Sequence, residues 1–373
     1  MPLWITSELY RSRRIEMSSS PISGSATGRL EVLGNHTDYN QGLVLAMSVG
    51  FTLEVQGEKR SDEKLMFRAK DLGQSWEGSL ADLSPQDKAG WANYILGVLQ
   101  GLKDRGIPLS GLQLELSSNL PMGAGLSSSA ALTVATQRCL QRLWGYTMPS
   151  REMAKISQQA EHRYAGVKCG LMDPMAIIHA KKDHLVLIDF RSLEVTAIPF
   201  AEEALFVVAS CGEKHALVDG EYNERRRSCE EAARLLGLAS LREIGLEEME
   251  KRKDAMPDRI HRRAFHVTGE TDRVQRAVTH LKNDDLAAFG RLLDESQESS
   301  SVNFENSIPA LDKLCQASKQ SPGHLGARLS GGGFGGSTLH LIEAAKEKEF
   351  LASFLPKAEA ALRHPVQYFI TRP

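Results

Sequence analysis

Residues 120–131 read LPMGAGLSSSAA, and this glycine- and serine-rich stretch joins a predicted strand to a predicted helix. Before it, Leu112, Leu114 and Leu116 alternate with polar residues as in a half-buried strand, and after it apolar residues recur at helical spacing as far as Leu143. A glycine turn that opens a helix leaves backbone N–H groups without partners at the positive end of the helix dipole. The stretch therefore predicts a phosphate-binding loop, with its serine hydroxyls as further donors or as metal ligands.

A second interpretation of this loop stays open. The loop contains neither Gly-Lys-Ser/Thr nor Gly-x-Gly-x-x-Gly, so it matches neither the P-loop nor the dinucleotide fingerprint. A glycine–serine turn before a helix is also typical of an ordinary helix cap. The loop alone does not decide between phosphate binding and capping.

Size and composition indicate a two-domain globular protein. The 373 residues exceed what one hydrophobic core usually organises, and we place a boundary near Glu194, which gives domains at 1–194 and 195–373. A formal net charge of −2 argues against nucleic acid or an anionic membrane as a partner. The five cysteines are scattered and no apolar run is long enough to span a bilayer, so the expected location is the cytoplasm.

The expected strands and helices alternate irregularly, which favours the α+β class over a doubly wound sheet. Strands are predicted at 43–55 with a break at Gly50, and at 112–116, 184–190, 204–209, 326–329, 338–342 and 366–371. Helices are predicted at 91–102, after the glycine–serine loop, and at 152–164, 222–236, 257–281, 286–296, 310–317 and 344–362. Hairpins and loops are expected between residues 56 and 87.

Two further segments carry clusters of polar side chains. Residues 28–42 read GRLEVLGNHTDYNQG and offer the directional donors and acceptors that a polyhydroxyl ligand requires, although a polar turn with Asx caps is the alternative. Residues 161–174 read EHRYAGVKCGLMDP and present Asp173 among apolar neighbours. This carboxylate can accept a hydroxyl proton if a cation keeps it ionised, or it can cap a helix that starts at Pro174.

A third segment, residues 329–337, reads LSGGGFGGS between two predicted strands. Its glycines imply positive φ angles and a close approach of the backbone to another group. A flexible hairpin loop is the alternative. The central Phe334 favours a loop that faces a ligand.

In this order the three segments resemble the three motifs of the GHMP kinases, and within them those of the galactokinases. The connecting segments 91–94, 169–173, 187–194 and 221–227 add to the likeness, which covers the chain from Ala26 to about Ile342. The resemblance implies an N-terminal domain with a mixed sheet and a C-terminal domain with a ferredoxin-like arrangement. ATP and sugar would meet in the cleft between them, and we expect a monomer.

The resemblance also implies site residues by position. Around the sugar these are Arg29, Asn35, His36, Asp38, Gly170, Asp173 and Tyr222. The phosphate loop comprises Gly123, Ala124, Gly125, Leu126, Ser127, Ser128 and Ser129, and Trp91 is expected near the adenine. Ser129 and Glu161 match the positions associated with Mg²⁺.

The implied reaction is the ATP- and Mg²⁺-dependent phosphorylation of the anomeric hydroxyl of galactose, which yields galactose 1-phosphate. Asp173 would orient or deprotonate that hydroxyl, and Arg29 would keep the carboxylate ionised. Whether Asp173 is a base or only orients the hydroxyl stays open. The loop amides and Mg²⁺ would stabilise the charge of the transferred phosphoryl group.

Several residues depart from the galactokinase pattern. Asn35 stands where galactokinases usually carry the Glu that holds the sugar's O6 hydroxyl, and its neutral amide predicts galactose binding that is weaker by up to about thirtyfold. Glu31 replaces a common Asn, and Pro174 replaces the usual Gln.

These departures leave two alternatives. One is a 1-kinase for galacturonate or N-acetylgalactosamine, and the other is a sugar sensor without catalysis. A kinase for mevalonate or homoserine is disfavoured by the signature around His36.

Overall fold

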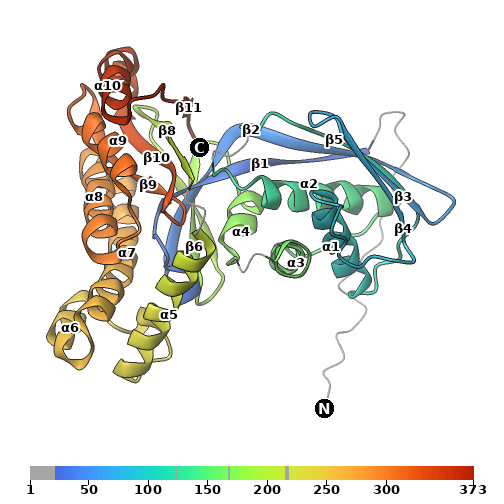
Figure 1. The fold of residues 1–373 in the computed structure, drawn as a ribbon, viewed down its shortest axis with the longest axis horizontal. Helices are drawn as coiled ribbons and strands as arrows, with labels where there is room; N and C mark the ends of the chain where they lie inside the picture. The colour runs from blue at the N-terminus through green and yellow to red at the C-terminus, as the bar shows by residue number, and fades with distance from the viewer. Residues whose placement is uncertain (1–21, 122–124, 167–168, 215–217) are drawn as a thin grey trace. The chain divides into compact units, whose positions relative to one another are not determined.

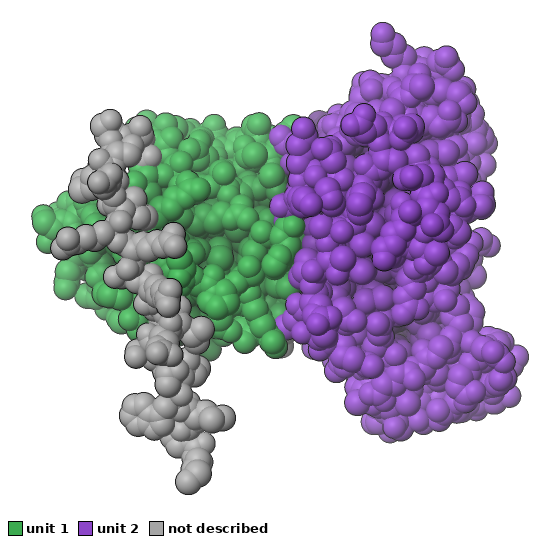
Figure 2. Space-filling model, turned by 180° about the vertical axis from the view of Figure 1, so that it is seen from behind, with its two compact units in different colours: residues 1–28, 51–121, 126–179 green, residues 29–50, 122–125, 180–373 purple. Residues whose placement is uncertain are grey.

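The computed structural model describes residues 22–121, 125–166, 169–214 and 218–373, which form two compact units (Figure 2). Unit 1 contains residues 1–28, 51–121 and 126–179, and unit 2 contains residues 29–50, 122–125 and 180–373. The chain enters each unit more than once because strands β1 (Ile22–Leu33) and β2 (Leu43–Lys59) continue from one unit into the other. The expected boundary near Glu194 concerns the division into N- and C-terminal domains and stays a prediction.

Unit 1 is built on a mixed sheet. Its strands follow the hydrogen-bonded order β4 (Gln74–Ser79), β3 (Lys64–Ala69), β5 (Leu112–Ser118) and the second half of β2. β3 runs parallel to β5, whereas β3–β4 and β2–β5 are antiparallel. The alternate leucines of β5 are buried, as the period of two predicts.

The helices of unit 1 lie on one side of these strands in Figure 1: α1 (Ala92–Lys103), α2 (Ser128–Trp144), α3 (Ser150–Ala160) and α4 (Met172–Ile178). A π turn, Glu161–Ala165, follows α3 directly. α2 packs tightly on the strands at two glycines. A Cβ on Gly24 would lie 2.2 Å from the backbone nitrogen of Cys139, and one on Gly57 would lie 2.9 Å from Cys139 Sγ. The C-terminal half of α2 is thereby packed closely against β1 and β2.

Unit 2 contains two sets of strands. The first half of β2 pairs with β6 (His184–Asp189), which pairs with β7 (Val195–Pro199), all antiparallel. A separate antiparallel sheet has the order β11 (Tyr368–Thr371), β8 (Ala204–Lys214), β10 (Gly335–Glu343) and β9 (His324–Ser330). This sheet agrees with the ferredoxin-like arrangement expected for the C-terminal domain.

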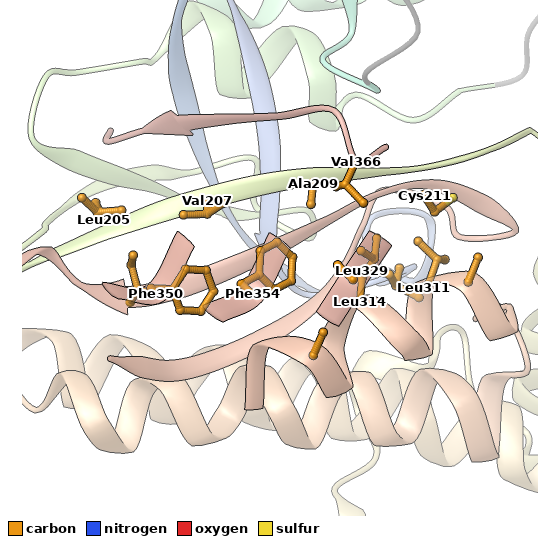
Figure 3. Packing of buried hydrophobic residues seen from close by; sticks show 14 residues of the cluster. Leu205, Val207, Ala209, Cys211, Leu311, Leu314, Leu329, Phe350, Phe354 and Val366 are labelled. Carbon is orange, nitrogen blue, oxygen red and sulfur yellow. The ribbon is translucent and has the colours of Figure 1, made fainter. Parts of the chain in front are cut away.

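One hydrophobic core of unit 2 lies between this sheet and the helices α9 (Pro309–Lys319) and α10 (Glu347–Leu362) (Figure 3). Leu205, Val207 and Ala209 project from one face of β8 because alternate side chains of a strand point the same way. Phe350 and Phe354 of α10 stack against each other with ring centroids 5.1 Å apart. All five side chains are almost fully buried.

A second core joins three other helices of unit 2: α5 (Val218–Leu236), α6 (Leu246–Lys251) and α7 (Asp258–Lys282). α8 (Leu286–Ser299) packs against β9, where Gly290 and Gly326 touch so closely that a Cβ on Gly326 would lie 2.0 Å from the Gly290 carbonyl oxygen. Short 3-10 helices cover Asp38–Asn40, Leu241–Glu243, Lys253–Ala255 and Ala344–Lys346. A second π turn, Ser300–Phe304, ends α8.

The α+β class and the predicted helices are confirmed, but the strand predictions need two corrections. The expected break at Gly50 is wrong: β2 is continuous, and Gly50 lies between the part that pairs with β6 and the part that pairs with β5. The patterns also miss β1 and β7. In β1 the polar residues Arg29 and Glu31 are themselves buried, so the usual alternation of apolar and polar residues does not mark the strand.

Candidate active site

The glycine–serine loop (residues 125–129) leads into α2 through two left-handed residues. Gly125 has φ 73°, and Ser127, at the N-cap of α2, has φ 56° and ψ 56°. A non-glycine residue with positive φ is uncommon, and here the Ser127 side chain does not cap the helix. Its Oγ donates instead to Asp173 Oδ2 at 2.5 Å. The predicted loop and the predicted acid of unit 1 are therefore in direct contact, while Gly123 and Ala124 lie outside the described residues.

Asp173 is the second residue of α4, and Leu171 is its N-cap residue. The interpretation of Asp173 as the cap of a helix that starts at Pro174 is therefore wrong. The preceding chain is held at the Cys169 carbonyl oxygen, which accepts from Gln158 Nε2 at 3.2 Å and lies 2.8 Å from His162 Nε2. These contacts tie the segment that contains Gly170 to α3 and its π turn, and so they help fix Asp173.

Ser129 and Glu161 form another hydrogen bond between a loop serine and a carboxylate of unit 1. Ser129 Oγ, in the first turn of α2, donates to Glu161 Oε1 at 3.1 Å, and Glu161 is the buried first residue of the π turn. Mg²⁺ prefers oxygen ligands and is usually held by one or two protein groups together with substrate phosphates and waters. A hydroxyl and a carboxylate next to the predicted phosphate loop therefore fit a magnesium site.

Two other predicted residues make defined contacts. Arg29, on β1, donates from Nη1 to the Gly125 carbonyl oxygen at 2.6 Å, so a cation borders the glycine turn. Trp91 is the N-cap residue of α1, and its indole Nε1 donates to Gln74 Oε1 at 2.9 Å. The expected pairing of Arg29 with Asp173 and the expected role of Trp91 near adenine stay predictions.

The signature turn (residues 34–40) follows β1 in unit 2 and has an unusual backbone. Gly34 has φ 101° and His36 has φ 59°. A Cβ on Gly34 would lie 2.3 Å from the Leu43 carbonyl oxygen, so only glycine fits there. Thr37 Oγ1 lies 2.8 Å from the Gly34 carbonyl oxygen and 2.7 Å from that of Leu43, which closes the turn. Asp38 starts the 3-10 helix and is half-buried.

His36 connects the signature turn to the glycine loop (residues 331–336). Its Nε2 lies 3.0 Å from the Gly332 carbonyl oxygen and its Nδ1 lies 2.8 Å from the Tyr39 hydroxyl. A carbonyl only accepts, so Nε2 carries the proton and Tyr39 donates to Nδ1. Burial lowers the pKa of His36 to about 4, and the ring is therefore neutral. Tyr222 packs beside it, with ring centroids 4.9 Å apart.

Asn35 is fully buried, and its amide nitrogen and its amide oxygen both have protein partners. Nδ2 donates to Glu31 Oε1 at 2.9 Å and to the Gly331 carbonyl oxygen at 2.7 Å, while Oδ1 accepts from Asn306 Nδ2 at 2.8 Å. Glu31 also accepts from Arg328 Nη2 at 3.1 Å. Burial raises the pKa of Glu31 although Arg328 opposes this shift. A contact of Asn35 with a ligand stays a prediction.

The glycine loop has the positive φ angles that its sequence predicts: 84° at Gly331, 82° at Gly333 and 60° at Phe334. A Cβ on Gly333 would lie 2.2 Å from the Asn306 carbonyl oxygen, which in turn accepts from the Phe334 N–H at 2.7 Å. Phe334 is buried, and the Arg225 guanidinium lies 5.1 Å from its ring centroid. This loop is therefore a packed and hydrogen-bonded segment that joins the antiparallel strands β9 and β10, and its interpretation as a loop that faces a ligand stays a prediction.

The sequence interpretation misses four buried polar residues that hold the signature turn and the glycine loop: Glu270, Arg273, Asn306 and Arg328. One signal could have found Glu270. It occupies a position of the helical spacing defined by Ile260, Ala264, Val267 and Val274, which marks the buried face of α7. A carboxylate on a buried face requires partners.

Models of known protein families match the parts of the chain that contain these segments. The model of the GHMP kinases N terminal domain matches residues 93–181, and that of the GHMP kinases C terminal domain matches residues 277–360. The galactokinase galactose-binding signature matches residues 14–56, which include the signature turn.

Curated relatives and solved structures point the same way. Human galactokinase is 40% identical over 350 residues, which cover 91% of this chain and 89% of that protein. Galactokinase from Haemophilus influenzae is 38% identical over 86% of this chain and 85% of its own. The structure of Lactococcus lactis galactokinase complexed with galactose superposes with a TM-score of 0.90 at 27% identity, covering 95% of this chain and 94% of that one.

More distant structures share only the fold. Methanococcus jannaschii mevalonate kinase has a TM-score of 0.67 at 18% identity, covering 95% of this chain and 98% of its own. An identity of 40% over nine-tenths of the chain, together with the matched galactose-binding signature, assigns the family. The chain therefore belongs to the galactokinase family, a sugar-kinase branch of the GHMP kinase superfamily.

Proposed function

We propose that this protein transfers the γ-phosphoryl group of ATP to the anomeric hydroxyl of galactose. The observation that carries the proposal is the hydrogen bond from Ser127 to Asp173, because it joins the predicted phosphate loop to the candidate catalytic carboxylate. The galactokinase relatives support the sugar, and they do not favour the alternatives of a galacturonate kinase, an N-acetylgalactosamine kinase or a sensor without catalysis.

In this mechanism Asp173 acts on the nucleophile. The anomeric hydroxyl donates to the carboxylate, which orients its oxygen for in-line attack on the γ-phosphorus. As the new O–P bond forms, the bond to the bridging oxygen of ATP breaks, ADP leaves and Asp173 takes the hydroxyl proton. Ser127 holds Asp173 in place through its 2.5 Å hydrogen bond.

The phosphate side requires positive charge. Ser129 and Glu161 would hold Mg²⁺, which when bound neutralises charge on the transferred phosphoryl group. Arg29 adds a fixed cation at Gly125, and the backbone N–H groups at the start of α2 favour anions. We further propose Leu126 and Ser128 as members of this loop and Trp91 as a contact of the adenine.

The sugar side uses the signature turn. We propose that Asn35, His36, Asp38, Gly170 and Tyr222 surround galactose. Because burial keeps the His36 ring neutral, His36 contributes shape and hydrogen bonding rather than charge. Asp38 at the start of its 3-10 helix supplies the carboxylate of this group.

ADP release with MgATP over galactose, galacturonate, N-acetylgalactosamine and arabinose tests the function. We expect the highest kcat/KM with galactose. A preference for another sugar would refute galactose as the substrate and identify Asn35 as a residue to examine first. Sugar binding without turnover of any of the four would refute the catalytic proposal and support a sensor.

We also propose that the enzyme acts as a monomer in the cytoplasm. Its five cysteines are free thiols, which suits a reducing compartment. Within the part of the chain that the structure describes, no helix is both long and apolar enough to cross a membrane. Light scattering at assay concentration tests the monomer, and a mass twice that of the 41.1 kDa chain would contradict it.

A further inference from the structure

Glu270 lies in the middle of α7, far in sequence from the three motifs, yet it contacts the signature turn directly. Its Oε2 accepts the backbone N–H of Gly34 at 2.9 Å and that of Asn35 at 2.8 Å. Its Oε1 accepts from Arg273 Nε at 2.7 Å. The side chain is completely buried, so these protein groups replace water around the carboxylate.

The two N–H groups come from consecutive residues and converge on one oxygen. Such a pair of backbone donors forms an anion-binding concavity, and here an internal carboxylate fills it. A buried N–H that loses its acceptor is costly, so the turn depends on this oxygen. On its other side, Gly34 lies so close to the Leu43 carbonyl oxygen that a Cβ would be only 2.3 Å from it. The backbone therefore has little room to shift in that direction.

Charge balance keeps Glu270 in the state that this contact needs. Burial by itself would raise the pKa of Glu270, but the charges of Arg273 and Arg328 and the hydrogen bond from the Asn35 N–H oppose burial and hold the pKa below its usual range. The carboxylate is therefore ionised at neutral pH and accepts strong, charge-assisted hydrogen bonds.

We propose that Glu270 is a positioning residue for galactose recognition: its carboxylate fixes the backbone at Gly34 and Asn35 and thereby the direction of the side chains that follow. The proposal rests on the proposed function of the signature turn. His36 and Asp38 lie within four residues of the two anchored N–H groups in the sequence. A shift of this backbone would move them together, whereas the residues assigned to ATP lie on other segments.

Two double variants separate the acceptor from the ion pair. Both Glu270→Gln/Arg273→Met and Glu270→Met/Arg273→Met remove the buried charges, but only the first keeps an oxygen for the two N–H groups. We expect the Gln variant to keep the galactose KM within about threefold of the parent and the Met variant to raise it about tenfold or more, the equivalent of one lost hydrogen bond. The KM for ATP should stay within about twofold in both, because only sugar recognition depends on the turn.

Asp272→Asn is the matched control. It removes one carboxylate from the same helix, and Asp272 is partly exposed and pairs with Arg276 rather than with the turn. We expect parental KM values for both substrates. Thermal melts of every variant confirm folding.

A folded Met variant with the parental galactose KM would overturn the proposal, as would equal increases in the KM values of galactose and ATP. If the Met variant does not fold, Glu270→Gln alone decides, since its amide NH₂ opposes Arg273 and should weaken the anchor. We then expect amide hydrogen exchange at Gly34 and Asn35 to be about tenfold faster than in the parent, and an unchanged exchange rate would refute the anchor.

Hydrogen exchange does not depend on turnover. A parent enzyme that fails to phosphorylate galactose would therefore refute the proposed function and leave the test of the anchor intact.

Discussion

The signature turn of unit 2 and the glycine–serine loop, whose serines belong to unit 1, carry the two halves of the proposed chemistry. Different kinds of contact hold them in place. In the signature turn, Asn35 is fully buried, and Glu270 accepts its backbone N–H. In the glycine–serine loop, Ser127 and Ser129 are half-exposed and each bonds to one carboxylate.

The difference separates two kinds of organisation. A buried network of charged groups fixes geometry strongly, and removing one partner leaves another buried and unpaired. A loop of half-exposed hydroxyls contributes little to the free energy of unfolding, but its polar groups are accessible to a nucleotide. We therefore expect substitutions in the signature turn to affect stability and sugar affinity, and substitutions around the glycine–serine loop to affect turnover.

Asp173→Asn is the sharpest test of this division and should have the largest effect. The amide keeps the shape of the side chain and can accept the Ser127 hydrogen bond, but it cannot take the proton of the anomeric hydroxyl. We expect kcat to fall by a factor of about 10²–10⁴, while galactose and ATP binding by calorimetry stay close to the parent. Parental kcat in the folded variant would refute the role of Asp173.

Asn35→Glu tests the buried side of the comparison. A carboxylate at this position would meet the Glu31 carboxylate, which now accepts from Asn35 Nδ2 at 2.9 Å, and both would be buried. We expect the free energy of unfolding in urea to fall by about 3 kcal/mol, as when a buried polar pair is broken.

The reciprocal variant Glu31→Asn/Asn35→Glu is the matched control for that test. It keeps one amide and one carboxylate in contact and exchanges only their positions, so it should recover at least half of the lost stability. Equal losses in the single and double variants would show that the two residues are not coupled. The double variant also allows a direct comparison of galactose with galacturonate, because it places the negative charge where galactokinases usually carry it.

The buried side should also respond to acid. The pKa of His36 is lowered by burial from 6.5 to about 4, and those of His266 and His340 are lowered to about 3. Between pH 6.5 and pH 4 the unfolded chain binds protons that the folded chain refuses, so stability falls as the pH falls through this window. For His36 alone the loss at pH 5 is about 2 kcal/mol relative to pH 7.

Urea unfolding at pH 7, 6 and 5 measures this loss. His36→Gln keeps a donor for the Gly332 carbonyl oxygen and removes the titration, so its stability should depend less steeply on pH than that of the parent. The same slope in both proteins would contradict the buried, neutral state of His36.

The two regions also differ in how far the sequence predicts them. The glycine–serine loop is local: its turn, the helix that starts at Ser128 and the strand before it all follow from neighbouring residues. The sequence also singles out Asp173, although its contact with Ser127, across 46 positions, requires the fold.

The signature turn is recognisable by its residues, but its supports are not. Glu270, Asn306 and Arg328 come from α7, from the segment after a π turn and from β9, and each is separated from the turn by more than 200 residues. Buried polar partners of this kind are chosen by tertiary packing, and no local motif marks them. For the same reason the expectation that Asn35 faces the sugar does not include the Glu31, Gly331 and Asn306 groups that surround it.

Ser127→Ala should have the smallest of these effects and completes the comparison on the exposed side. It removes the hydrogen bond to Asp173 and leaves the carboxylate in place, so the loss is one bond to a charged group, about 1.5 kcal/mol or a roughly tenfold lower kcat. Because Ser127 is half-exposed and does not cap α2, the melting temperature should hardly change. Ser61→Ala, at an exposed serine of the same unit, is the control and should have parental kcat. A large drop in melting temperature with unchanged kcat would mean that Ser127 stabilises the loop and does not position Asp173, and it would erase the difference between the two regions.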